Sequence, residues 1–112
     1  MSGGQAWGSK APKVLGLTSA ATIALDVRSA PAFKLTPGSA VTINASDGGK
    51  PLEELIFFFD TVGGSSYNVT FGTNFRPSAV LATGTVTLQR FIVRFVSDGI
   101  VWSEVSRTAA LP

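Results

Sequence analysis

The sequence predicts an all-β protein, an antiparallel β-sandwich or jelly roll with a flexible N-terminal arm. Apolar and polar residues alternate over short segments, as at Ile23, Leu25 and Val27, which is the period of a half-buried strand. These segments are separated by Gly, Pro, Asn and Asp, the residues that form turns. No segment sustains the period of about 3.6 residues that an amphipathic helix requires.

Length and composition indicate one packed domain. The chain has 112 residues, of which 45% are apolar and 14% charged. The charged share is well below the globular average of about 25%, which argues against disorder. We place the β-sandwich (jelly-roll) domain at residues 14–112, after an arm at residues 1–13.

The arm is rich in Gly, Ser and Lys and contains a single aromatic residue, Trp7. Such a segment buries too little apolar surface to hold itself in place, so we expect it to be flexible in isolation. Trp7 either lies loosely on its own domain or anchors the chain to a partner. For the second case the candidate partner-binding residues are Gln5, Trp7 and Lys10.

Turn residues delimit the strands in order. The predicted strands are 22–27, 32–35, 40–44, 55–60, 67–71, 84–89, 90–96 and 100–106. Residues 36–39, with Pro37 presetting a turn, separate the second and third strands. Residues 46–51 form a longer loop. Residues 72–74 break the fifth strand, and we expect Phe75 to pack back under the loop that follows. Asp98-Gly99 is the strongest hairpin signal in the chain.

Two strands are apolar on both faces, which a sheet with one solvated face does not need. One set of faces carries Leu55, Phe57 and Phe59 with Phe91, Val93 and Phe95; the other carries Ile56 and Phe58 with Ile92, Arg94 and Val96. Either another subunit or a loop or arm of the same chain has to cover the second face, and we favour an oligomer. Alternation does not reveal which face is the core. The candidate interface residues are therefore Ile56, Phe57, Phe58, Phe59, Phe91, Arg94 and Phe95.

The composition offers little chemistry. The chain has no histidine and no cysteine, which removes the commonest general base, the thiolate nucleophile and the commonest metal ligands. We expect no enzyme, no cofactor and no metal site. The net charge is +2 without a basic cluster, so nucleic acid and membrane surfaces are poor candidates for partners. There is no apolar run of about 18 residues and no secretory signal, which predicts synthesis in a cytosol.

Trp102 and Glu104 are two positions apart on one predicted strand and therefore share a face. An indole that stacks on a sugar ring, next to a carboxylate that accepts hydroxyl hydrogens, would form a glycan-binding site. The alternative is a surface Glu beside a half-buried Trp.

The order of several motifs resembles a small jelly-roll domain of tailed-bacteriophage virion proteins. The shared pattern is "I-x-L-D", "F-x-L-T", "V-x-I", an apolar strand, a Gly-rich turn with a strand and loop, and "F-x-x-D-G-x-x-W-x-E". In this chain these segments are 21–26, 32–36, 40–44, 55–59, 67–75 and 95–105. The resemblance covers residues 15–107 and departs from the pattern at 51–54, where the family more often has a Gly-Gln-type start to the strand.

The resemblance implies a trimeric, non-enzymatic virion protein. A single small module with an arm is similar to the capsid decoration (cement) proteins, whose partner is the major capsid protein. Its location would be the surface of the head in a virion assembled in the host cytoplasm. The alternative is a tail-fibre or tail-tip module that binds host surface glycans. A third hypothesis is a monomeric carbohydrate-binding module of non-viral origin.

Overall fold

The computed structural model describes residues 13–112, and its regular elements there are all strands. The prediction of an all-β fold is therefore confirmed. The strands are β1 (Val14–Gly16), β2 (Thr22–Leu25), β3 (Ala32–Leu35), β4 (Val41–Ala45), β5 (Glu54–Asp60), β6 (Asn68–Phe71), β7 (Phe75–Arg76), β8 (Leu81–Ala82), β9 (Arg90–Ser97) and β10 (Trp102–Arg107).

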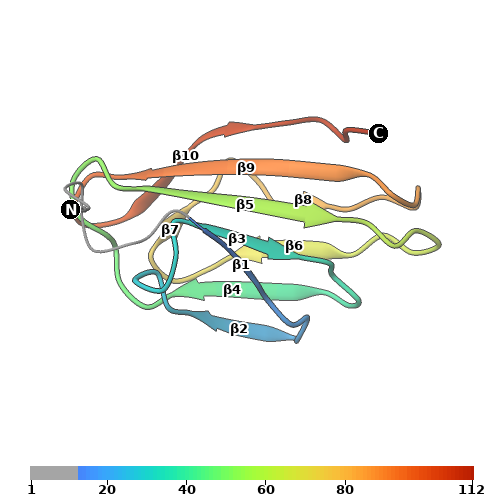
Figure 1. The fold of residues 1–112 in the computed structure, drawn as a ribbon, viewed down its shortest axis with the longest axis horizontal. Helices are drawn as coiled ribbons and strands as arrows, with labels where there is room; N and C mark the ends of the chain where they lie inside the picture. Colours follow the sequence, from blue (N-terminus) through green and yellow to red (C-terminus); the bar gives the residue numbers. More distant parts are fainter. Residues whose placement is uncertain (1–12) are drawn as a thin grey trace.

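The strands form two sheets. A six-stranded sheet has the order β1-β3-β5-β9-β10-β7, and a four-stranded sheet has the order β2-β4-β6-β8. The strands run along the long axis of the molecule, with β5 and β9 side by side in the larger sheet and β2 at an edge of the smaller one (Figure 1).

The antiparallel arrangement predicted from the sequence is wrong for most of the fold. Five of the eight strand pairs in residues 13–112 are parallel, namely β1–β3, β3–β5, β2–β4, β4–β6 and β10–β7. From β1 to β6 the chain alternates between the two sheets and adds one strand to each in turn. This winding is that of a short β-solenoid and not of a jelly roll. Parallel strands need a long crossover, usually a helix; here a strand of the opposite sheet serves as that crossover.

Antiparallel pairing occurs where the chain finishes the larger sheet and also between β6 and β8 of the smaller one. β9 pairs with both β5 and β10. The predicted hairpin at Asp98-Gly99 is confirmed between β9 and β10: Oδ1 of Asp98 accepts hydrogen bonds from the amides of Ile100 (2.9 Å) and Val101 (3.0 Å), and Gly99 has a φ of 97°. This left-handed conformation strongly favours glycine.

The segment 84–89, predicted as a strand, is a loop instead. This loop surrounds the side chain of Thr61, a residue that follows β5 and is buried. The Thr61 hydroxyl donates to the carbonyl of Val86 (2.6 Å) and accepts from the amide of Gln89 (3.0 Å). Gly84 and Leu88 both have positive φ values, 76° and 59°, which end the extended conformation that the alternating sequence predicts.

The core between the sheets is dominated by phenylalanine. Phe57 of β5 lies at its centre, with ring centroids of the neighbouring phenylalanines 5.3 to 6.0 Å away. These neighbours are Phe33, Phe59, Phe71, Phe75 and Phe95. Phe75 is buried, as the sequence predicts. The inward faces of β5 and β9 are therefore covered by residues of the same chain.

Candidate functional site

The outward side of the six-stranded sheet carries half-buried apolar residues beside ordered ion pairs. Along β5 and β9 every second residue points inward and is buried, so the residues between them point outward. We call the resulting surface the outer face. Its members are Lys34 of β3, Glu54, Ile56, Phe58 and Asp60 of β5, and Arg90, Ile92, Arg94 and Val96 of β9.

The centre of the outer face is an apolar stripe. Ile56, Phe58, Ile92 and Val96 are all half-buried. The register places Phe58 directly beside Ile92 and Ile56 beside Arg94. The guanidinium carbon of Arg90 lies 5.3 Å from the centroid of the Phe58 ring, within cation–π range.

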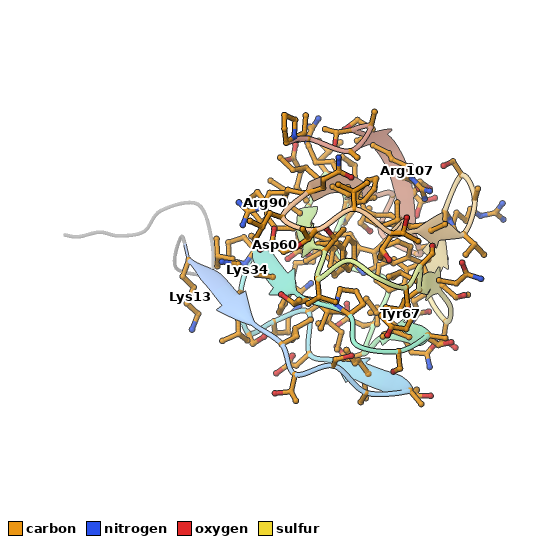
Figure 2. All side chains as sticks on the ribbon, turned by 90° about the vertical axis from the view of Figure 1, so that its right-hand side faces the viewer. Lys13, Lys34, Asp60, Tyr67, Arg90 and Arg107 are labelled. Carbon is orange, nitrogen blue, oxygen red and sulfur yellow. The ribbon has the colours of Figure 1, made fainter. Side chains whose placement is uncertain are left out.

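An ion pair lies toward each end of the outer face, and Arg94 of the second pair separates Val96 from Ile92 on β9. At one end Arg90 donates two hydrogen bonds to Asp60, from Nε to Oδ1 (2.6 Å) and from Nη2 to Oδ2 (2.9 Å). Lys34 approaches the same carboxylate at 3.8 Å. At the other end Nη2 of Arg94 lies 2.8 Å from Oε2 of Glu54. Lys34, Asp60 and Arg90 project from the same side of the molecule, away from Tyr67 (Figure 2).

These contacts change the acidity of both carboxyl groups. The hydrogen bond from Arg90 lowers the pKa of Asp60, and the hydrogen bond from Arg94 lowers the pKa of Glu54. Both carboxylates are therefore ionised at neutral pH. The outer face thus combines half-buried apolar residues with ordered charges of both signs.

The structure divides the predicted interface residues into two groups. Phe57, Phe59, Phe91 and Phe95 point into the core with exposures of 1%, 0%, 9% and 0%, so they are not available for subunit contact and that part of the prediction is wrong. Ile56, Phe58 and Arg94 lie on the outer face. The pairing of Asp60 with Arg90 and of Glu54 with Arg94 is not visible in the sequence pattern. The register of β5 on β9, which reveals both pairs, requires knowledge of which strands are neighbours.

An open hollow of about 470 Å³ adjoins the outer face at the C-terminal end of β5. It is lined by Asp60, Thr61, Leu88, Gln89, Arg90, Leu111 and Pro112. Leu88 is 84% exposed and has a φ of 59°, an unfavourable conformation for leucine. The hollow shares Asp60 and Arg90 with the outer face, so it is an extension of that surface.

The predicted glycan pair has a different role. Trp102 and Glu104 do share a face, but it is the inward one: Trp102 is 0% exposed, and its Nε1 donates to the carbonyl of Asp47 (2.8 Å). A buried indole cannot stack on a sugar ring, so the glycan-binding prediction is wrong for Trp102. The register partner of Trp102 on β9 is Ser97. Hydrogen bonds made by the side chain of Ser97 and by the carbonyl of Asp47 connect the loop between β4 and β5 to the β9–β10 hairpin.

Glu104 is held in an ion pair and has little freedom to bind a ligand. Its side chain is 6% exposed and lies 2.8 Å from Nη2 of Arg107. The amide and the hydroxyl of Ser78 both donate to the carboxylate at 2.9 Å. Burial by itself raises the pKa of Glu104, but the hydrogen bonds from Arg107 and Ser78 outweigh it and hold the pKa below the usual range.

Acid should therefore destabilise the fold through Glu104. Its folded pKa is lower than its unfolded pKa, so its stabilisation is fully present well above about pH 4.3 and is lost as the pH falls through the folded value. Glu104→Gln should cost about 1–3 kcal/mol at pH 7, because it leaves Arg107 without a charged partner. The Tm of wild type should exceed that of the variant at pH 7, and this difference in Tm should become smaller as the pH falls to 3. A difference in Tm that does not depend on pH would contradict this role.

The proposed arm residues Gln5, Trp7 and Lys10 lie outside the described residues. Within residues 13–112 no three acidic side chains are close enough together to hold a metal ion. None of the described residues belongs to a helix that could cross a membrane. Searches of protein-family models, curated proteins and solved structures find no match to this chain.

Proposed function

We propose that the protein is a non-enzymatic structural protein of a bacteriophage virion, a homotrimeric decoration protein that binds the outer surface of the capsid and stabilises the head. The observation that carries this proposal is the outer face. Its half-buried apolar stripe beside ordered ion pairs suits association with another protein surface. The class of protein is taken from the order of motifs that resembles phage virion proteins. It does not rest on the jelly roll of that family, because the strands of this chain wind as a β-solenoid.

In this proposal the two parts of the chain have separate tasks. The outer face joins the copies of the protein, and the arm, with Gln5, Trp7 and Lys10, binds the major capsid protein. Three linked arms bind far more tightly than one, because the second and third contacts become intramolecular once the first has formed. Trp7 is the residue we expect to contribute most, since buried tryptophans dominate many interfaces.

A tail-fibre or tail-tip module that binds host glycans is the alternative within the virion. Its sequence basis was an exposed pair, Trp102 and Glu104. The indole is in the core and the carboxylate is paired with Arg107, so no described feature favours this alternative.

Light scattering and co-sedimentation with undecorated capsids test the proposal together. We expect wild type to have the mass of three chains and to sediment with capsids. Trp7→Ala should keep that mass but bind at least about tenfold more weakly, because three contacts weaken at once. Phe58→Lys should yield single chains and should also bind weakly, because the linkage between arms is lost.

Thr70→Lys is the matched control. Thr70 is half-buried on the outward side of β6 in the other sheet, so the substitution introduces the same charge on a strand without touching the outer face. It should leave mass and binding unchanged. A wild-type protein that stays monomeric at all concentrations, or that fails to sediment with capsids, would disprove the decoration function.

A further inference from the structure

The charges of the outer face are sorted by strand. Both acidic residues, Glu54 and Asp60, are on β5, and both arginines, Arg90 and Arg94, are on β9. These two strands are neighbours in the middle of the six-stranded sheet. One half of the outer face is therefore acidic along β5 and the other half is basic along β9.

The register also places complementary residues of the two halves at the same position along the strands. Asp60 is level with Arg90, and Phe58 is level with Ile92. Arg94 is level with Ile56 but its guanidinium reaches Glu54 at 2.8 Å. On β5, Asp60 and Phe58 are thus level with complementary residues of β9, and Glu54 is nearly level with Arg94.

Closed oligomers are built by rotation, and the direction of the axis decides which strands meet. An axis parallel to β5 and β9, above the line between them, places β5 of one copy opposite β9 of the next at unchanged height. Asp60 then faces Arg90, and Phe58 faces Ile92. A two-fold axis across the strands would instead place β5 on β5 and β9 on β9, with like charges opposed, which is unfavourable.

We infer that the copies of this chain associate through their outer faces about an axis parallel to the strands, with β5 of each copy on β9 of the next. This inference rests on the proposed oligomer and specifies its interface. The intrachain pairs Asp60–Arg90 and Glu54–Arg94 become the centre of ion-pair networks shared between copies. Lys34 of β3, on the far side of β5, faces β10 of the neighbouring copy and not its arginines.

Cross-linking tests the strand pairing directly, because the chain has no cysteine of its own. Asp60→Cys and Arg90→Cys chains, distinguished by a mass tag, are co-expressed and treated with a short bis-maleimide. Mixed pairs, which join one Asp60→Cys chain to one Arg90→Cys chain, should clearly exceed either like pair, because only in a mixed pair do the two thiols lie directly opposite one another. Both substitutions leave the apolar stripe in place.

Thr42→Cys and Thr70→Cys provide the control. These positions are register partners on the four-stranded sheet, as Asp60 and Arg90 are on the six-stranded one. Their chains should give no cross-linked pairs above background.

Like pairs of Asp60→Cys chains as the main product would overturn the inference, because Asp60 would then lie opposite Asp60 of the other copy and not opposite Arg90. Absence of mixed pairs from a protein whose wild-type mass is oligomeric would also overturn it, while leaving the proposed assembly intact. Mixed pairs from a protein that does not bind capsids would support the interface and reject the decoration function.

Discussion

Phe57→Ala should lower the free energy of unfolding by about 3–5 kcal/mol, the range for removing a large aromatic side chain from a packed core. Phe57 is 1% exposed and contacts aromatic rings from β3, β5, β6, β7 and β9, so its removal leaves a cavity that both sheets share. Urea unfolding followed by circular dichroism measures the loss, provided that wild type and variant are compared under conditions where both are monomeric.

Phe58→Ala is the control, because it removes the same side chain one residue further along the same strand. Phe58 points to the outer face and is half-buried, so we expect a loss of only about 1 kcal/mol in the monomer. Its main effect should be on association. Equal losses for Phe57→Ala and Phe58→Ala would contradict the assignment of inward and outward faces on β5.

Trp102→Ala should be comparably destabilising, by about 3–5 kcal/mol. The side chain is fully buried, and its Nε1 hydrogen bond to Asp47 joins the β4–β5 loop to β10. Tm by calorimetry would report the loss, which we expect to be large enough to unfold part of the population at physiological temperature.

Trp102→Phe separates packing from the hydrogen bond. It keeps most of the apolar volume and should recover more than half of the stability, leaving a deficit of about 1–2 kcal/mol from the smaller ring and the unpaired carbonyl of Asp47. If Trp102→Ala were instead as stable as wild type and had lost affinity for a glycan, the indole would be accessible. The burial of Trp102 would then be refuted and the glycan-binding hypothesis restored.

Most of the strands were predictable from the sequence because each is short and bounded by residues that cannot continue it. Alternation identified β2, β3, β4, β5 and β9 to within a residue or two. The Asp98-Gly99 turn was recognisable because its geometry depends on the side chain of Asp98 and the positive φ of Gly99. The same criterion failed at 84–89, where alternating residues form a loop around the buried hydroxyl of Thr61.

The pairing of the strands was not predictable from the same patterns. With no helix in the sequence to serve as a crossover, antiparallel pairing was the natural expectation. The structure achieves parallel pairing by sending each crossover through the opposite sheet, so that β3 follows β1 by way of β2 and β5 follows β3 by way of β4. Nothing local to β2 or β4 distinguishes a crossover from a hairpin partner.

The all-β class and the two apolar faces of β5 and β9 can be read from the residues alone, because both properties follow from the two-residue period of a strand and need only neighbouring residues. The burial of Phe57 and Trp102, the position of Phe58 on the surface and the pairing of Asp60 with Arg90 become visible only in the folded chain. Those are properties of which strands lie side by side and which side of each sheet the other sheet covers. They arise from contacts between residues distant in the chain, which no local pattern records.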